Sequence, residues 1–310
     1  NKELSIAESI AREVEDTFAE TAASLWLAYT AWKQGFTSSF LLYIEQALAL
    51  VSKHNYQFLF TKPTILGSND PTIFVPLLLA AKADGVQPET ASQLLDRLDC
   101  AGLAYHPGSV LKISTLGRFE VMVGDKYIEG DRWKREKSRQ MLQILSAAGD
   151  KGMSRDQICL ILWPDASPQE AANSFKVVLN ALNQSLEPDR TAGVPAFYVK
   201  RTDDIYQLRS APHVLIDHIL FEQNAVLQKA DHQETAFNLY LGHLLANELV
   251  QESFLPTEHY LHRLFLDTAS KLGNKALDSD YPQKAILIGQ KIIQIDPYYE
   301  DGYALQMKAY

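Results

Sequence analysis

The sequence has few cysteines, no long apolar run and no signal segment. Its two cysteines, Cys100 and Cys159, lie far apart and follow neither a disulfide framework nor a metal-ligand spacing, so we expect reduced structural thiols. No apolar run approaches the roughly 20 residues that a membrane helix needs, and no basic and apolar leader opens the chain. We therefore expect a cytoplasmic protein that does not enter a membrane.

The sequence also lacks the short motifs of common catalytic sites. The stretch AGDKGMSR at 148–155 differs from a phosphate-binding loop because it has no Gly-Lys-Ser/Thr ending and lies between two expected helices. No Gly-x-Ser-x-Gly, paired catalytic carboxylate or dinucleotide fingerprint is present. His259 and His262 could hold a metal ion, but no third ligand follows at a usual spacing, so we favour solvated histidines. We predict no enzymatic activity, no cofactor and no metal.

The sequence does contain enough apolar residues for a packed core, and its charge is uneven. With 310 residues, of which 46% are hydrophobic, the chain can form two or three domains. The formal net charge is −9, yet residues 109–210 carry 15 basic and 13 acidic side chains, and both flanks are acidic. A basic middle third bears on partners and not on fold. Because the chain starts at Asn1 and both ends lie in helix-like patterns, we expect a fragment.

The hydrophobic pattern changes twice along the chain. Apolar residues at spacings of three and four predict antiparallel helices over 6–99, which resemble degraded tetratricopeptide-like repeats. After Pro107-Gly108 the pattern alternates, which predicts strands with a tight turn at Gly124-Asp125. Beyond Pro212 the sequence is helical again. The expected helices there cover 218–230, 234–247, 259–277 and 283–297. The last of them, with the segment YYEDGYALQMKAY that follows it, resembles one tetratricopeptide hairpin and the opening of another.

Three short helices and a hairpin follow the first strands. The expected helices run from about 133 to 148, from Ser154 to the residue before Pro164, and from Ser167 to Leu186. Gln157 and Glu170 each lie three residues after a serine, as in a capping box. The stretch AFYVKRTDDIYQL at 196–208 predicts two strands around a polar turn.

The third of these helices has an apolar and a polar face. The apolar stripe consists of Ala172, Phe175, Leu179, Leu182 and Leu186. The opposite face carries Asn173, Lys176, Val177, Asn180, Asn183 and Gln184. Short amides are poor helix formers, but they can bond the edge of adenine in a major groove, which admits a helix. We predict that this face contacts DNA bases; a solvated polar face is the alternative.

The start of the first short helix is unusually basic. Five of the eight residues from 132 to 139 are cations, namely Arg132, Lys134, Arg135, Lys137 and Arg139. Cations near a helix start oppose its dipole, each by about 0.3–1 kcal/mol, which favours a contact with DNA phosphates or with an acidic protein surface over a solubilising surface. We expect Ser138, Met141, Leu142 and Leu145 to face inward.

Other cations flank this surface. We assign Arg155 and the hairpin residues Lys200 and Arg201 to contacts of the same kind. Asp203 and Asp204 follow the hairpin cations directly, so a plain surface hairpin stays as an alternative for that turn.

Several stretches together resemble a known family. They are LKISTLGRFEV at 111–121, DRWKREKSRQMLQIL at 131–145, MSRDQICLILWPD at 153–165, ANSFKVVLNALNQSLEP at 172–188 and IYQL at 205–208. In this order they resemble the winged helix of SARP-type (antibiotic-regulatory) transcriptional activators, a branch of the OmpR/PhoB-like fold. Residues 213–310 resemble the bacterial transcriptional activator domain that follows it in that family.

The resemblance implies a mainly α fold, with tetratricopeptide-like helical hairpins flanking a central winged helix-turn-helix that has a small antiparallel sheet and a C-terminal hairpin. The implied domains are a helical-repeat segment at 1–108, a winged helix at 109–210 and an activator domain at 211–310. The family usually has Leu-Arg and further basic residues near the end of the third helix. Here Leu182-Asn183-Gln184 stands instead, so other positions must supply the phosphate-binding charge.

The implied function is activation of transcription by sequence-specific binding to double-stranded promoter DNA and contact with RNA polymerase, in a bacterial cytoplasm at the nucleoid. A homo-oligomer is compatible with this function. The alternative is a helical-repeat scaffold for protein interactions whose winged helix no longer binds DNA. The acidic flanks and the missing arginine near Asn183 favour the alternative.

Overall fold

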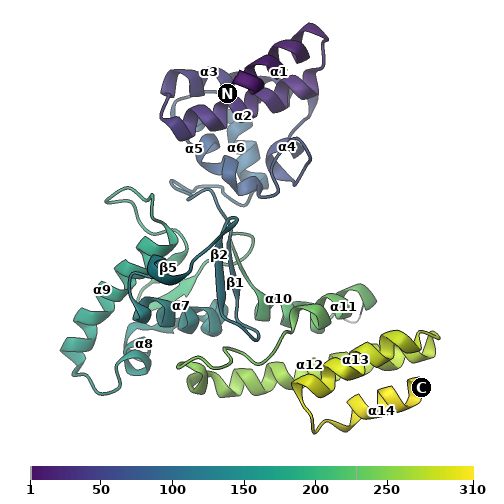
Figure 1. The fold of residues 1–310 in the computed structure, drawn as a ribbon. Coiled ribbons are helices and arrows are strands. Elements are labelled where there is room, and N and C mark those ends of the chain that lie inside the picture. The colour runs from purple at the N-terminus through teal and green to yellow at the C-terminus, as the bar shows by residue number, and fades with distance from the viewer. Residues whose placement is uncertain (1, 228) are drawn as a thin grey trace. The chain divides into compact units, whose positions relative to one another are not determined.

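The computed structural model describes residues 2–227 and 229–310 (Figure 1). They form two compact units, each with its own core. The first unit comprises Asn1–Val110 and Asp189–Phe197, and the second comprises Leu111–Pro188 and Tyr198–Tyr310. The predicted fold class, mainly helical with a small sheet, three helices and a hairpin, is confirmed.

The first unit is built from helices, as the periodicity predicted. Its elements are α1 (Lys2–Glu13), α2 (Thr17–Gln34), α3 (Thr37–His54), α4 (Phe58–Thr61), the 3-10 turn η1 (Pro71–Phe74), α5 (Val75–Ala83) and α6 (Pro88–Arg97). The Asp16 carboxylate accepts hydrogen bonds from the first N–H groups of α2, and Gly35 ends that helix in a left-handed conformation.

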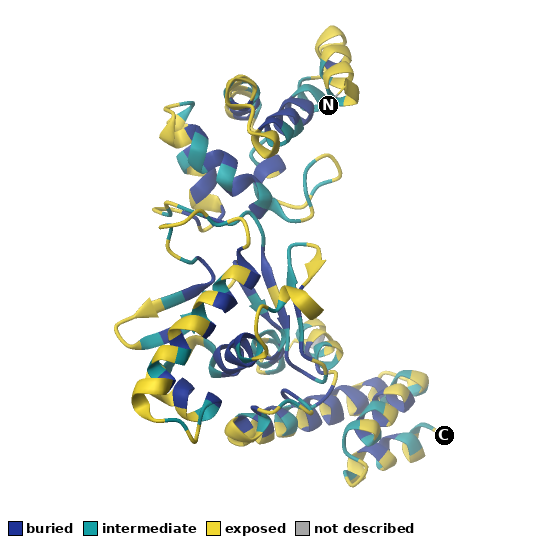
Figure 2. Ribbon diagram, turned by 60° about the vertical axis from the view of Figure 1, so that its left-hand side comes forward, coloured by how far each residue is buried: buried dark blue, intermediate teal, exposed yellow. Residues whose placement is uncertain are grey.

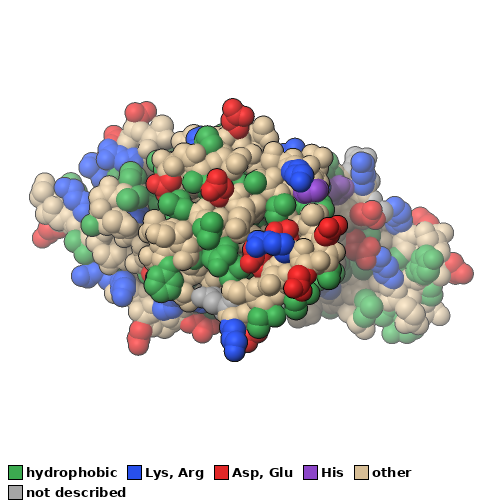
Figure 3. Space-filling view, turned by 90° about the horizontal axis from the view of Figure 1, so that it is seen from above, with side chains coloured by type: hydrophobic (Ala, Val, Ile, Leu, Met, Phe, Trp, Pro, Cys, Tyr) green, Lys and Arg blue, Asp and Glu red, His purple; other side chains and the backbone are tan. Residues whose placement is uncertain are grey.

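The core of the first unit lies where its helices face one another (Figure 2). Phe40, Ile44 and Leu48 of α3 are fully buried, and so are Phe60 and Phe74 between the longer helices. On the face shown in Figure 3, acidic, basic and apolar side chains are interspersed. Neither the acidic nor the basic side chains form an extended patch there.

The second unit begins with a small sheet. Its strands are β1 (Leu111–Ser114), β2 (Glu120–Val123), β3 (Lys126–Tyr127) and β7 (Val214–Ile216), in the order β3-β2-β1-β7. The turn predicted at Gly124-Asp125 joins β2 to β3, whose pairing is antiparallel. Strand β7 was predicted to be part of a helical region, but it pairs in parallel with β1. The sheet is therefore mixed and not purely antiparallel.

Three helices and a hairpin complete the winged part of this unit. The helices are α7 (Glu136–Ala148), α8 (Arg155–Leu162) and α9 (Pro168–Leu186), with short turns η2 (Gly130–Arg132) and η3 (Gly149–Lys151) around α7. The second sheet contains β4 (Met153–Ser154), β6 (Ile205–Leu208) and β5 (Val199–Thr202), in that order. Both predicted capping boxes are present, at Ser154 with Gln157 and at Ser167 with Glu170.

Helices α10 to α14 form the rest of the unit, and α12, α13 and α14 lie side by side (Figure 1). Their bounds are α10 (Asp217–Ala225), α11 (Ala230–Leu239), η4 (Gln251–Phe254), α12 (Leu255–Asp278), α13 (Pro282–Ile295) and α14 (Glu300–Ala309). The helix predicted at 218–230 corresponds to α10, and it included Gln228, which lies outside the described residues. Gly289 lets the predicted terminal hairpin close, because an added Cβ would lie 2.7 Å from the Gly302 carbonyl oxygen.

The prediction of a helix at 234–247 was wrong in its second half. Helix α11 ends at Leu239, and residues 240–250, which we call the docking segment, follow without helical structure. The backbone of this segment bonds to the loop after β1: Gly117 N–H donates to the His243 carbonyl at 2.9 Å, and Leu245 N–H donates to the Thr115 carbonyl at 2.7 Å. A Cβ on Gly242 would lie 2.9 Å from Gly117 Cα, so this close approach requires glycine.

A buried carboxylate joins the same loop to α10. Asp217, the first residue of α10, accepts hydrogen bonds from the N–H groups of Thr115 and Leu116 and from the Thr115 hydroxyl. His218 Nδ1 lies 2.8 Å from that hydroxyl. Burial raises the pKa of Asp217 and lowers the pKa of His218 to about 4, so His218 is neutral at physiological pH.

No helix among the described residues has the length and apolar character needed to cross a membrane.

Candidate nucleic-acid interface

Helix α9 begins at the capping box that the sequence predicted, with Ser167 as its N-cap. The Ser167 hydroxyl accepts a hydrogen bond from Glu170 N–H, and the Glu170 carboxylate accepts one from Ser167 N–H. Pro168 occupies the first helical position, where no N–H is needed. The Ser167 hydroxyl, which donates to the Glu170 carboxylate at 2.6 Å, and the Ser167 N–H together lower the pKa of Glu170, whose negative charge suits a helix start.

Helix α9 has one buried and one exposed face, as predicted, but at two positions the buried residue is the neighbour of the predicted one. Phe175, Leu182 and Leu186 are buried as predicted. Ala171 and Val178 are buried in place of Ala172 and Leu179, which are only partly covered. The shift follows from the helical period of 3.6, because the strip that faces α7 and α8 drifts relative to a fixed spacing.

The polar face of α9 is open to solvent. Among its six predicted base-contacting residues, the exposed ones are Asn173, Lys176, Val177, Asn180 and Gln184, and Asn183 is partly covered. The Asn183 side-chain oxygen is buried and has no hydrogen-bond partner among the described residues. The remaining side chains are free to meet a partner along one side of a 19-residue helix.

An aromatic contact connects α9 to the β5–β6 hairpin. The rings of Phe175 and Tyr206 meet edge to face, with centroids 4.9 Å apart. On the hairpin, the Arg201 guanidinium lies 5.6 Å from the centre of the Tyr206 ring, and Arg201 is paired with Tyr206 across the strands. Tyr206 of the hairpin therefore fixes the position of the hairpin against α9 by packing on Phe175.

The cations at the hairpin have acidic neighbours. Arg201 donates to the Asp203 carbonyl at 2.6 Å and forms an ion pair of 3.3 Å with Asp204. Arg155, at the start of α8, pairs with Asp156 at 3.0 Å, and this hydrogen bond raises the pKa of Arg155. Exposed pairs of this kind are weak, so the two arginines can exchange a carboxylate for a phosphate. The side chain of Lys200 is half-buried and makes no ion pair within the described part of the chain.

The basic run divides into two groups. Helix α7 starts at Glu136 and not near residue 133, so Arg132, Lys134 and Arg135 precede the helix and are exposed. The exposed Arg132 guanidinium also donates to the Tyr127 carbonyl at 2.9 Å. Arg135 is the N-cap residue, so its charge still opposes the helix dipole, whereas Arg132 and Lys134 lie before the cap.

Ser185 places the exposed group beside the end of α9. Its hydroxyl donates to the Arg132 carbonyl at 2.9 Å, and Lys134 N–H approaches the same hydroxyl at 3.5 Å. Nothing in the local sequence distinguishes Ser185 from other helical serines, so its role depends on the tertiary structure. Its effect is to bring cations to the end of α9, where Asn183 and Gln184 carry no charge.

The second group of cations is occupied within the chain. Lys137 Nζ donates to the Leu162 carbonyl at 2.8 Å. Arg139 forms two hydrogen bonds with Glu248 of the docking segment, one of them 2.8 Å long, and lies over the Phe119 ring. The inward positions predicted for α7, namely Ser138, Met141, Leu142 and Leu145, are all buried.

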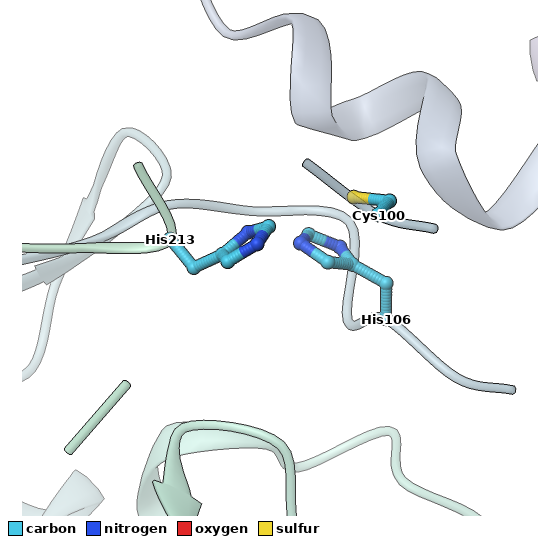
Figure 4. Close-up of side chains that lie close together, drawn as sticks. All are labelled: Cys100, His106 and His213. Atoms are coloured by element: carbon cyan, nitrogen blue, oxygen red, sulfur yellow. The ribbon is translucent and has the colours of Figure 1, made fainter. Parts of the chain in front are cut away.

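The two cysteines are free and buried. Figure 4 draws Cys100 together with His106, both after the last helix of the first unit; His213, also labelled there, belongs to the second unit. His106 Nδ1 accepts a hydrogen bond from Gly108 N–H at 2.9 Å, and its ring meets Phe197 with centroids 4.4 Å apart. These contacts organise the loop after α6.

The fold is similar to that of a known protein. The structure of Mycobacterium tuberculosis EmbR in complex with a low-affinity phosphopeptide matches this chain with a TM-score of 0.50 and 16% sequence identity. The match covers 65% of this chain and 55% of EmbR, so the chain spans about half the length of that protein. Neither a family model nor a curated protein sequence matches this chain. The likeness concerns the fold alone.

Proposed function

We propose that this chain is part of a DNA-binding transcriptional regulator of SARP type, which reads promoter DNA with the exposed face of α9. The observation that carries the proposal is the open amide face of α9, a helix that contacts Tyr206 of the hairpin through Phe175 and the segment of Arg132, Lys134 and Arg135 through Ser185. The similarity to EmbR in fold supports a regulator of this class.

The chemistry of the α9 face fits direct reading of bases. Asn and Gln side chains can form two hydrogen bonds with adenine, and an apolar side chain can meet the methyl group of thymine. Asn173, Asn180 and Gln184 provide the amides, and Val177 is a 48% exposed apolar side chain among them. Lys176 can reach either guanine or a phosphate.

Phosphate contacts would come from cations outside the helix. Arg132, Lys134 and Arg135 lie beside the end of α9, where the resemblance led us to expect arginine within the helix itself. Arg155, Lys200 and Arg201 would serve the hairpin side. Lys137 and Arg139 are engaged within the chain and contribute less to such a surface.

Activation requires a contact with RNA polymerase as well as with DNA. The cations that do not meet phosphates, together with the helical region after β7, are the surfaces available for it. On this proposal the protein works in the bacterial cytoplasm at the nucleoid, it has no enzymatic role, and a homo-oligomer on DNA is compatible with the exposed surfaces.

The experiment is a binding titration of the chain with pools of genomic DNA fragments at several salt concentrations. Replacing Arg132, Lys134 and Arg135 together by glutamine should weaken binding to all sequences alike. It should also make the log–log salt dependence shallower by about 0.9 for each phosphate that is no longer neutralised. The matched control is Lys53, Lys82 and Arg97 of the first unit replaced by glutamine, which removes the same charge elsewhere. Normal DNA binding with reduced transcription would assign the group to polymerase instead.

A second candidate function is a protein-interaction scaffold whose winged helix does not bind DNA. The ion pairs of Arg139, Arg155 and Arg201 favour it, because each takes a predicted DNA cation into an intramolecular contact. The same titration decides between the two functions. If the wild-type chain shows no salt-dependent DNA binding at low salt, the scaffold is the better description.

A further inference from the structure

Three side chains with metal-binding groups meet where the docking segment reaches α12. His243 comes from the docking segment, and Glu258 and His262 lie four residues apart on one face of α12. One ligand atom from each lies within 4.8 Å of the other two. Atoms bound to one tetrahedral zinc ion lie about 3.3–3.6 Å apart, so side-chain rotations that draw these groups together would complete a site.

The carboxylate at the centre of this cluster is shielded from water. The Glu258 side chain is 8% exposed, and its Oε1 lies 2.5 Å from His243 Nδ1. The His243 and His262 rings stack, with centroids 4.9 Å apart. A buried carboxylate needs a hydrogen-bonded or charged partner, and two imidazoles on one side of it can share a cation.

His262 is held in the way that metal-bound histidines are held. Its Nε2 lies 3.3 Å from an oxygen of Asp296, at the end of α13. Its Nδ1 is buried and has no hydrogen-bond partner among the described residues. In metal sites one ring nitrogen binds the ion and the other donates to a carboxylate, which fixes the ring. Nδ1 is therefore the nitrogen of His262 that is available to an ion.

We propose that His243, Glu258 and His262 bind a Zn²⁺ ion, with Asp296 positioning the imidazole of His262. Two neutral imidazoles and one carboxylate are a zinc donor set that leaves a fourth position for water. Nitrogen donors favour zinc over Mg²⁺ and Ca²⁺, which prefer oxygen. Imidazole and carboxylate groups bind a metal ion in their deprotonated forms, so binding should weaken at low pH.

The site would connect three parts of the second unit. The His243 carbonyl already accepts a hydrogen bond from Gly117, in the loop between β1 and β2. An ion on the side chain of His243 would join that loop to α12 and, through Asp296, to the end of α13. The sequence pointed to His262 only in a pair with His259, and the search for a third ligand after them missed Glu258 and His243, which come before them in the chain.

The experiment is Zn²⁺ titration of the chelator-treated chain, with bound metal measured by mass spectrometry and the melting temperature measured in parallel. We expect stoichiometric binding and a higher melting temperature with Zn²⁺. His243→Asn, Glu258→Gln and His262→Asn should each abolish both effects. Asp296→Asn should leave the chain folded and weaken binding by about 10-fold to 100-fold, as loss of such a carboxylate does elsewhere.

Two controls make the result specific. His232→Asn changes a histidine of α11 whose Nδ1 lies 2.8 Å from the Asn224 side-chain oxygen and which contacts none of the three proposed ligands, so Zn²⁺ binding should be unchanged. Replacing Cys100 and Cys159 by serine should also leave binding unchanged. If wild-type chain takes up no Zn²⁺, or if uptake survives the changes at His243, Glu258 and His262 and disappears with the cysteines, the proposed site is wrong.

Discussion

Helices α7 and α9 belong to the same unit, and both carry polar side chains, yet they expose them very differently. Nine of the 13 residues of α7 are buried, compared with seven of the 19 residues of α9. The buried residues of α7 include Ser138, Gln140, Gln143 and Ser146. Helix α7 is therefore a central packing element, and the amides of α9 are the ones that a partner can reach.

The same difference separates the cations of the basic run. Arg139 on α7 is held by Glu248, and Lys137 is held by a backbone carbonyl. The cations before α7 are exposed at the end of α9. A cluster that is continuous in sequence is thus divided by the structure into a structural half and a half that can bind an anion.

The largest effect on stability is expected within α9, where a substitution on the buried face can be compared with one on the exposed face. Phe175→Ala should lower the free energy of unfolding by about 3–5 kcal/mol, because removal of a fully buried ring leaves a cavity. Val177→Ala, two residues away on the exposed face, should change it by less than about 0.5 kcal/mol. Urea denaturation followed by circular dichroism measures both. Equal effects would mean that the two faces of α9 are assigned incorrectly.

A buried polar group elsewhere in the unit predicts a pH effect. Burial lowers the pKa of His218 to about 4, so between pH 6.5 and 4 the unfolded chain binds a proton that the folded imidazole does not. Stability should fall over this range by up to about 3 kcal/mol. The raised pKa of Asp217 acts in the opposite sense once that carboxyl begins to bind a proton in the folded state.

The measurement is the free energy of unfolding against pH for the wild type and for His218→Asn, which retains a polar atom near the position of Nδ1. In the His218→Asn variant, most of the fall in the free energy of unfolding between pH 6.5 and 4 should disappear. The His259→Asn variant, which changes an exposed histidine, should show the same fall in stability as the wild type. A wild-type pH profile in His218→Asn would mean that another group causes the decline.

The ion pair of Arg139 with Glu248 tests the structural half of the basic run. Its hydrogen bonds raise the pKa of Arg139, whose side chain is only 24% exposed. Glu248→Ala should lower the free energy of unfolding by about 1–3 kcal/mol, because a half-buried guanidinium loses its partner. Glu136→Ala removes the longer, exposed contact to the same arginine and should have little effect. Thermal unfolding of the two variants makes the comparison.

The smallest effect on stability, with a clear effect on recognition, is expected for the amides of α9. Asn173→Ala, Asn180→Ala and Gln184→Ala should leave folding unchanged. Removing one amide that forms two hydrogen bonds with adenine should reduce discrimination between DNA sequences by about 1–3 kcal/mol. Gln140→Ala, on the buried α7, is the contrasting variant and should affect stability but not sequence preference. Selection from a randomised DNA pool reads out this difference.

Most of the winged part could be predicted because its elements are specified locally. The capping boxes at Ser154 and Ser167, the turn at Gly124-Asp125 and the alternation of β5 and β6 depend on residues only a few positions apart. The division of α9 into faces was predicted for the same reason, and its one-residue shifts reflect the direction in which α7 and α8 lie.

The sequence by itself determined the succession of strands, three helices and a hairpin in the winged part, the inward residues of α7 and the amide face of α9, because periodicity and capping are local properties. Only the tertiary structure decided that β7 pairs with β1, that residues 240–250 leave the helical pattern, and that Ser185 holds the basic segment beside α9. It also decided that His243 meets Glu258 and His262. Each of these depends on backbone or side-chain groups distant in sequence, which find partners only when the chain has packed.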